Sequence, residues 1–423
     1  MAGATGQAAL PPLNDTQQWL GTPLIRQAGR EVLSLALMDA RNHTLRLLEV
    51  FEQAQGWSDA PSPQSPSVAG LVGRIAWFQE RWILRNLQRN LGASCAPDAP
   101  RLAPLQPEAD AWWEDPNDLS PVSGRPGLTA LRADLLQVLE STLDLLALAP
   151  ETDEGLYFFR LALHHEDLQG ERLLQRMQAA GLRPAREWVQ ACTPRAFAPR
   201  EPLLLPATRA LLGSQGPGFA FDNELPAHSL AVPAFEIDAQ LVSWAQFVEF
   251  VDDGGYDRQA LWQPAGWTWL QALAQDEGRR GPRYVEQLGA AGGAVRQIRF
   301  GQAARPAIGQ PVMHLSWWEA EAWCRWAGRR LPFEAEWELA ALTASGRGFV
   351  WGDVWEWTAG GFYPYEGFVS GPDVGYSRGG FGRSKVLRGG SCATPGRLKS
   401  PRLRHFAVPE ADELFCGFRS CAL

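Results

Sequence analysis

The sequence predicts a four-helix bundle in residues 1–185, a linker over 186–205 and a compact, irregular domain over 206–423. Three observations lead to this prediction. Apolar residues recur at helical spacing up to about residue 182, and short segments broken by glycine follow residue 206. Between them lie five prolines: Pro184, Pro194, Pro199, Pro202 and Pro206. A chain of 423 residues is long enough for two separate cores.

Four segments of the first part carry the helical pattern. They span residues 30–54, 68–91, 128–148 and 153–180. Gly92 and Gly181 stand where the second and fourth segments would end, a position that favours glycine. Four helices of this length joined by polar loops are typical of a helical bundle. The connection over 93–126 is long for such a bundle, so we expect it to cover part of the structure.

The second part has a different composition. Most of the 19 tryptophans lie there, which favours a hydrogen-bonded irregular fold or a pocket lined by aromatic rings. Only residues 239–251 and 317–327 have the pattern of helices of useful length. The six cysteines form no C-x-x-C pair, so we expect no disulfide framework, and we interpret the cysteines as structural.

Charge and hydropathy exclude several classes of partner. The formal net charge of −8 argues against nucleic acid or an anionic membrane. No apolar run reaches the roughly 18 residues that a membrane helix needs. The first residues, MAGATGQAALPPLNDTQQ, lack the pattern of a secretory signal. These features predict a cytoplasmic protein that acts on small molecules.

The stretch HHEDLQGE, residues 164–171, raises the question of a metal site. In a helix, His165 and position 169 share one face, where two imidazoles could bind one ion. Position 169, however, is Gln169. The stretch is therefore a metal site, the remnant of one, or a helix that contains a histidine satisfied inside the bundle. His164 points about 100° away and is expected to pack elsewhere, and His43 is expected at the surface or between helices.

Segments of the second part resemble the formylglycine-generating-enzyme family, whose fold is an α+β variant of the C-type-lectin fold. The resemblance rests on PVMHLSWWEAEAWCRWAGRRLPFEAEWELAA, GDVWEWTA, VLRGGS and the final GFRS, and covers about 210 residues. That family uses two cysteines shortly after its G-G-S turn. Thr394 and Lys399 take their positions here. The resemblance therefore implies the fold, and not copper-dependent oxidation of a sulfatase cysteine.

A DinB-like bundle in front of this domain resembles the iron-dependent sulfoxide synthases of ergothioneine biosynthesis. These enzymes use O₂ to join a thiol to the imidazole carbon of hercynine, which is trimethylhistidine. GRIAWFQERWILRN and RLRHFAVPEADELFCGFRSCAL are most similar to the selenoneine synthase branch. Where the sulfur enzymes carry an Asn-Trp-Asp and an Arg for the donor's charges, this chain has His405, Phe406, Ala407 and Ala411. The resemblance implies a neutral selenosugar or thiosugar as the donor.

The resemblance also implies an Fe(II) ion held by three histidines, one in G-H-x-x-W-F-Q-E and two in H-E-x-x-H-x-E. Here only His165 is retained, and Arg74 and Gln169 take the other two positions. Arg74 is permanently cationic and repels a metal ion, and Gln169 is a weak ligand. Arg74 could instead form a buried ion pair with Glu80 or Glu171, which would keep the fold and abolish the chemistry. We therefore expect weak iron binding.

Aromatic residues complete the predicted site. Phe362, Tyr363 and Tyr365 are placed at the substrate, because aromatic faces can bind a trimethylammonium group. Of these, Phe362 and Tyr365 fall where the sulfur enzymes keep pocket tyrosines. Phe362 occupies the place of the tyrosine that donates a proton, so no catalytic residue is assigned. We also place His405 and Phe406 at the substrate. Trp355 and Trp357 belong to the GDVWEWT signature and are interpreted as structural.

Two functions follow from these expectations. The first is a selenoneine or ergothioneine synthase, an oxidoreductase with Fe(II), O₂, hercynine and a seleno- or thiosugar in a pocket between the domains. The second is a catalytically inactive family member that binds hercynine, its product or a partner protein. Metal occupancy separates them. A sulfatase-activating oxidase is disfavoured by Thr394 and Lys399.

Overall fold

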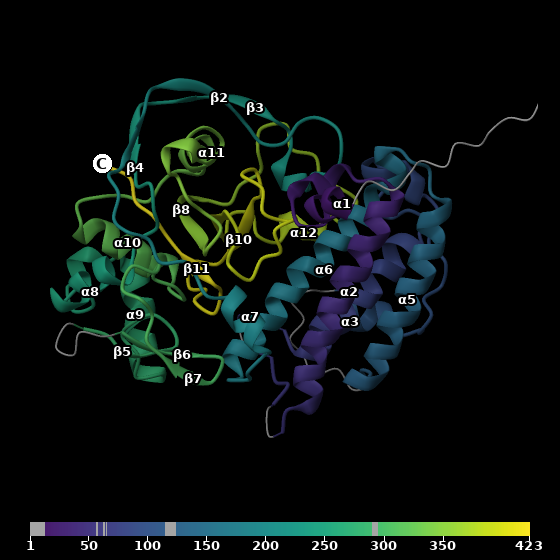
Figure 1. The fold of residues 1–423 in the computed structure, drawn as a ribbon, viewed down its shortest axis with the longest axis horizontal. Helices are drawn as coiled ribbons and strands as arrows, with labels where there is room; N and C mark the ends of the chain where they lie inside the picture. Colours follow the sequence, from purple (N-terminus) through teal and green to yellow (C-terminus); the bar gives the residue numbers. More distant parts are fainter. Residues whose placement is uncertain (1–12, 56–57, 62–63, 65, 115–123, 290–294) are drawn as a thin grey trace, which may run out of the picture.

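The protein consists of a helical bundle and a mixed α/β part that lie side by side (Figure 1). The computed structural model describes residues 13–423, except 56–57, 62–63, 65, 115–123 and 290–294. Most of the N-terminal stretch examined for a signal, and residues 115–123 of the 93–126 connection, lie outside the described residues. In the described part, no helix is both long enough and apolar enough to cross a membrane.

The four predicted helices of the bundle are present. They are α2 (Arg30–Gln53), α3 (Val68–Gln79), α5 (Leu128–Leu148) and α6 (Asp153–Ala179), preceded by α1 (Leu13–Leu20) and the 3₁₀ turn η1 (Pro23–Gln27). The longest, α6, begins at the cap Thr152, whose hydroxyl accepts the Gly155 N–H. Side chains on all sides of α6 are buried, because it packs on α2 and α3 on one side and on the second domain on the other.

The second predicted helix is shorter than expected. It ends at Gln79, continues as a π-helical turn η2 (Glu80–Leu84) and is followed by the 3₁₀ segment η3 (Arg89–Ser94). The Arg85 carbonyl leaves the helix and accepts the Leu102 N–H of the long connection. Gly92 does not stop a helix. It has a φ of +56° and lies so close to the Glu154 backbone that a Cβ would come within 2.7 Å of its Cα.

The connection over 93–126 covers α3, as predicted for the part that is described. It contains the short helix α4 (Ala109–Trp113). The Trp113 ring lies against Gly73, where a Cβ would come within 2.4 Å of it. Asp110 accepts hydrogen bonds from Arg85 and from the Trp77 indole. These contacts hold the connection over the outer face of α3.

The second domain is built around a four-stranded sheet in the order β10-β9-β8-β11. Its strands are β8 (Trp355–Gly361), β9 (Lys385–Arg388), β10 (His405–Ala407) and β11 (Cys416–Gly417). Pairing is antiparallel except between β11 and β8. Smaller sheets join β1 (Leu203–Leu205) to β4 (Phe235–Ile237), β2 (Thr208–Leu212) to β3 (His228–Val232), and β5 (Val285–Gln287) to β6 (Arg296–Arg299) and β7 (Gln302–Ala304). The expected α+β architecture is confirmed.

Helices of the second domain follow the prediction only in part. The 317–327 prediction corresponds to α10 (Trp317–Trp326). The 239–251 prediction starts too early, because α8 (Trp244–Asp252) begins only after its cap Ser243, which forms a capping box with Gln246 in the first turn. In the described part, two longer helices were missed, α9 (Pro264–Asp276) and α11 (Glu334–Thr343), and so was the short α12 (Gly375–Arg378). Pro264 at the first position of α9 is a start signal that the periodicity did not use.

The predicted linker carries structure of its own. It contains α7 (Arg186–Ala191), and its last residues enter β1. The Cys192 carbonyl accepts hydrogen bonds from Arg299 and from the Cys392 thiol. All six cysteines are free, as expected. The boundaries of the two domains stay a prediction.

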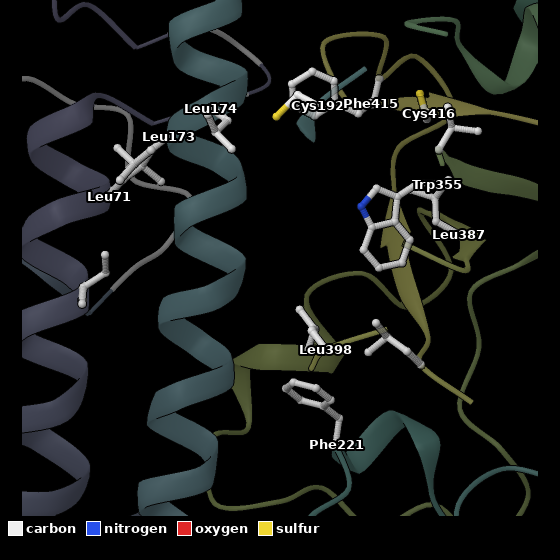
Figure 2. Close-up of a cluster of buried hydrophobic side chains, with 14 of the residues drawn as sticks. Leu71, Leu173, Leu174, Cys192, Phe221, Trp355, Leu387, Leu398, Phe415 and Cys416 are labelled. Atoms are coloured by element: carbon white, nitrogen blue, oxygen red, sulfur yellow. The ribbon is translucent and has the colours of Figure 1, made fainter. Parts of the chain in front are cut away.

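One hydrophobic core extends through both parts of the molecule. Leu173 and Leu174 of α6 belong to the same buried cluster as Trp355, Leu398 and Phe415 of the second domain. Figure 2 shows Leu174 on the side of α6 that faces Trp355, Leu398 and Phe415, and Leu173 on the side of Leu71. The bundle and the second domain are therefore packed against each other along α6, and this interface positions the candidate site.

Candidate functional site

The acidic residues of the HHEDLQGE stretch fix α6 in place. Glu166 lies inside the bundle and accepts hydrogen bonds from Arg41, Thr44 and Gln79, with the Arg41 Nε at 2.8 Å. Arg41 and Glu166 are each about 1% exposed. Since a buried charge is stable only when paired, this network ties α2, α3 and α6 together.

Glu171 joins α6 to the second domain. Its carboxylate accepts hydrogen bonds from Trp355 Nε1 at 2.9 Å and from the hydroxyls of Ser391 and Thr394, each at 2.6 Å. Burial raises the pKa of Glu171, against the lowering effect of these three donors. We call Glu171, Trp355, Ser391 and Thr394 the Glu171 cluster. Trp355 is structural, as predicted, and the structure adds that its partner lies in the other domain.

Asp167 makes a second connection between the domains. It accepts two hydrogen bonds from Arg397 Nε and one from Arg397 Nη2, the last at 2.7 Å, and Arg397 also binds Asp39 of α2. The Asp167 and Arg397 side chains are 2% and 6% exposed. His164 lies on this side of α6, beside the rings of Phe219 and Phe221. It packs away from His165, as predicted.

His165 and Gln169 face the other direction, toward α3, and contact each other. Their Nε2 atoms are 3.2 Å apart. The His165 ring is stacked on Phe78, with 3.9 Å between ring centroids and 5° between planes. Burial, and then the charges of Arg74 and Arg172, hold the pKa of His165 well below its usual value. His165 is therefore a neutral, stacked imidazole.

Arg74 is held by the long connection. Its Nη1 donates to the carbonyls of Trp113 and Glu114, at 2.6 and 3.3 Å. Glu80 instead accepts the Leu105 N–H, and Glu171 belongs to the Glu171 cluster. The expected ion pair of Arg74 with Glu80 or Glu171 is wrong, because both carboxylates are committed to other donors.

These residues do not fit the three-histidine iron site implied by the resemblance. One position carries a guanidinium that cannot lose its proton, and another carries an amide whose nitrogen faces the one remaining imidazole. Across the described ranges, no group of three or more His, Cys, Asp or Glu side chains could hold a metal ion. His43 offers no replacement, since it lies between helices against Trp188, in the interhelical position expected.

Three of the predicted aromatic and histidine positions lie together. His405 lies beside Trp355, with 4.9 Å between ring centroids, and beside Phe406 at 5.8 Å. Phe406 is stacked on the fully buried Phe362 at 4.2 Å. Burial, and then the charge of Arg172, lower the pKa of His405 to about 3. The rings of Trp355, His405, Phe406 and Phe362 therefore form a continuous row that begins at the Glu171 cluster.

Tyr363 and Tyr365 have different surroundings. The Tyr363 side chain is 59% exposed. The Tyr365 ring packs on His228 at 4.4 Å and beneath the Arg404 guanidinium at 3.9 Å. In the part of the chain that the structure describes, no ring contact or hydrogen bond joins either tyrosine to His165 or His405. Their assignment to the substrate stays a prediction.

A small pocket beside α6 was missed by the sequence interpretation. It is lined by Tyr157, Leu161, Phe221, Asp222, Gly371, Asp373 and Tyr376. The rings of Phe221 and Tyr376 are stacked at 4.9 Å. Burial raises the pKa of Asp373 to about 6, and Asp222 adds to the effect while Arg74 and Arg81 oppose it. Residues from both domains therefore form one polar and aromatic recess.

Arg172 is a second residue near the candidate site that the sequence motifs did not predict. It follows Gln169 by three residues and His165 by seven, so the three side chains share one face of α6. This spacing is visible in the sequence and could have been found. Neither Arg172 nor the pocket belongs to any motif on which the family resemblance rests.

Comparison with known proteins defines the class. Residues 191–353 match the FGE-sulfatase family model, described as a sulfatase-modifying factor enzyme 1-like domain. The formylglycine-generating enzyme of Streptomyces coelicolor is 37% identical over 154 residues, which are 34% of this chain and 48% of that protein. The second part is thus a domain of the sulfatase-modifying-factor class.

Longer relatives cover both domains. Hercynine oxygenase of Mycolicibacterium smegmatis is 31% identical over 443 residues, 92% of this chain and 98% of the relative. Hercynine oxygenase of Mycobacterium tuberculosis is 30% identical over 448 residues, with the same coverage. The chain belongs to the hercynine oxygenase family.

Proposed function

We propose that the protein acts on hercynine, which it binds between α6 and the second domain. The observation that carries this proposal is the similarity to hercynine oxygenases along nearly the full length of both proteins. It is supported by the way the Glu171 cluster, His405 and the aromatic recess gather residues from both domains around one face of α6. A substrate with an imidazole ring and a quaternary ammonium group suits neutral histidines and stacked aromatic rings.

The finer proposal concerns the reaction. We infer that selenium or sulfur from a selenosugar or thiosugar is joined to the imidazole carbon of hercynine in an O₂-dependent reaction. The support is the resemblance of the α3 segment and the C-terminal segment to the selenoneine branch. Ala407 and Ala411 add to it, since an uncharged pair of side chains suits a neutral donor better than a charged one.

A second candidate function is favoured by a specific observation. Arg74 and Gln169 replace two imidazoles of the family's iron site, and Gln169 faces His165 across 3.2 Å. A family member with this donor set would bind hercynine without converting it. The two candidates share the substrate and differ in turnover.

Calorimetry and turnover separate the candidates. Protein purified without oxygen is analysed for iron and titrated with hercynine. It is then supplied with Fe(II), O₂, hercynine and either a selenosugar or a thiosugar, and products are followed by mass spectrometry. Binding with product formation supports the synthase, and binding without product supports the non-catalytic member. If hercynine does not bind at all, the proposed function is wrong.

Sulfatase activation has no support in the arrangement of the G-G-S turn. Thr394 donates to Glu171, and the Lys399 Nζ donates to the Gly352 carbonyl at 2.7 Å. Both positions therefore serve the packing of the turn. A peptide containing C-x-P-x-R should remain unmodified when incubated with the protein, copper and O₂.

A further inference from the structure

Cys192 and Cys392 are two free cysteines that contact each other although 200 residues separate them. The Cys392 thiol donates to the Cys192 carbonyl, with 2.8 Å between sulfur and oxygen. Since a carbonyl oxygen lies about 2.4 Å from its own Cα, the Cys392 sulfur lies within roughly 5 Å of the Cys192 Cα. The pair is therefore close to the spacing of a disulfide, in which the two Cα atoms are about 4.4–6.8 Å apart.

The surrounding main chain already holds the two segments together. The Cys392 N–H donates to the Asp353 carbonyl at 2.8 Å. The Asp353 carboxylate accepts the N–H of Arg195, which follows Cys192 by three residues, at 2.9 Å. The Arg299 guanidinium donates to the Cys192 carbonyl at 2.7 Å. A bond between the two sulfurs would therefore need little movement of the main chain and would store little strain.

The two thiols differ in their access to solvent. All six cysteines lie in the described part of the chain, and Cys392 is the one among them that is not buried. A dissolved reagent can reach its sulfur, whereas the Cys192 side chain is only 2% exposed. An accessible thiol beside a shielded one is the arrangement of an attacking thiol and a resolving thiol.

The protonation of the pair sets the speed of its chemistry. Burial raises the pKa of the Cys192 thiol to about 12 and raises the pKa of Cys392 as well, while the charges of Arg299 and Lys399 oppose both effects. Both thiols are therefore protonated at neutral pH, and only the thiolate reacts. Exchange is slow, so the pair follows a sustained oxidising balance and not a brief one.

We propose that Cys192 and Cys392 form a reversible disulfide when small-molecule disulfides, such as oxidised glutathione, accumulate. The Cys392 thiolate attacks one sulfur of the small disulfide and releases the first small thiolate. The Cys192 thiolate then attacks the Cys392 sulfur and releases the second. The protein gives up two electrons and two protons, which end on two small-molecule thiols.

The disulfide would join the segment between the domains to the G-G-S turn. Cys192 is the C-terminal cap of α7, and Ser391, next to Cys392, donates to Glu171 of α6. The oxidised protein therefore holds α7 on the turn that carries the Glu171 cluster. Under reducing conditions the two thiols stay free. This redox response is independent of the ligand named in the proposed function.

The test follows mass and stability. Full-length protein is incubated with oxidised or reduced glutathione at mildly alkaline pH and quenched with acid. The oxidised sample should be lighter by two hydrogen atoms, and peptide mapping without reductant should find peptides joined through Cys192 and Cys392. Its thermal unfolding midpoint should rise by at least about 3 °C, because the bond closes a long loop in the unfolded chain. Dithiothreitol should reverse both changes.

Serine variants separate the roles of the two thiols. Cys192→Ser should retain one glutathione on Cys392, because no second thiol releases it, and Cys392→Ser should take up none. Cys95→Ser is the matched control, since it removes a buried thiol that contacts Asn86 in the bundle, and it should oxidise like the unmodified protein.

Several results would overturn the proposal. They are glutathione that remains on Cys392 of the unmodified protein, a different pairing, no reaction, or an unchanged unfolding midpoint after the disulfide has formed. If a serine variant does not fold, the peptide map of the unmodified protein decides.

Discussion

The indole N–H of Trp355 donates to the carboxylate of Glu171 across the interface between the two domains, at 2.9 Å and shielded from solvent. Glu171 is the last residue of the stretch that first suggested a metal site. Here its oxygens receive three donors from the second domain, so the glutamate serves domain packing. In the same stretch, Glu166 accepts a hydrogen bond from Arg41 inside the bundle, and Asp167 accepts hydrogen bonds from Arg397 of the second domain.

Glu171→Ala should destabilise the protein by about 2–4 kcal/mol, because Trp355, Ser391 and Thr394 would each keep a buried donor without an acceptor. Glu171→Gln should cost less, since an amide oxygen still accepts. Urea unfolding followed by tryptophan fluorescence measures both. Glu140→Ala, at an exposed position of α5, is the control and should change stability little. Equal effects of Glu171→Ala and Glu140→Ala would contradict the role of the cluster.

Restoring two histidines should restore iron binding. The double change Arg74→His, Gln169→His places three imidazoles on the adjacent helices α3 and α6, and Phe78 already orients the His165 ring. We expect Fe(II) to bind at least about 100-fold more tightly than in the unmodified protein, because even one supporting contact around a metal is worth 10- to 100-fold. Anaerobic Fe(II) titration measures this. Adding His165→Ala to the double variant should remove the gain, and tight iron in the unmodified protein would show that the ligands lie elsewhere.

Stability should depend on pH through Asp373. Its pKa of about 6 in the folded protein exceeds the usual value of 3.8, so the folded state holds this proton more firmly than the unfolded chain does. The favourable contribution is therefore present below pH 4 and is lost as the pH rises through 6. Asp373→Asn should raise stability by about 1–3 kcal/mol at pH 7 and change it little at pH 4, with partial exposure limiting the gain.

Thermal unfolding of Asp373→Asn and of the unmodified protein, measured from pH 4 to 8, compares their stabilities. The exposed Asp98→Asn serves as control and should not show the same pH trend. A gain at pH 7 no larger than that at pH 4 would mean that Asp373 is already ionised in the folded protein without penalty.

Trypsin should cut the predicted linker first. Arg200 is exposed and follows α7, whereas Arg195 is paired with Asp353 at 2.7 Å. Limited digestion should give two fragments of similar length that elute together, because one core joins the two parts. Mass spectrometry identifies the site, and Arg200→Gln should slow the cut. Early fragments that begin inside the second domain would place the boundary elsewhere.

Local patterns in the sequence predicted much of the fold. Helical periodicity placed the four bundle helices, and the end of the second was misplaced because a backbone pairing between Arg85 and Leu102 competes with the helix. The short helices α9 and α11 were missed because ten to thirteen residues in a glycine-broken region give a weak periodic signal. The motifs also identified Arg74 and Gln169 as departures from the three-histidine pattern. This identification requires only the residue types at the motif positions.

The tertiary structure decided which side chains that lie far apart in the sequence contact each other. Glu171 lies 220 residues before Ser391, and nothing in either local pattern shows that their side chains meet. The predicted pairing of Arg74 failed for the same reason, since the acceptors that hold it belong to a connection without a periodic pattern. Arg172 is visible on the face of His165 and Gln169, but whether its partly buried side chain has a partner depends on the groups that the fold brings around it. The sequence determined which residues are present on α6. The packing of the second domain against that helix determined which of their side chains have partners across the interface and which face the candidate site.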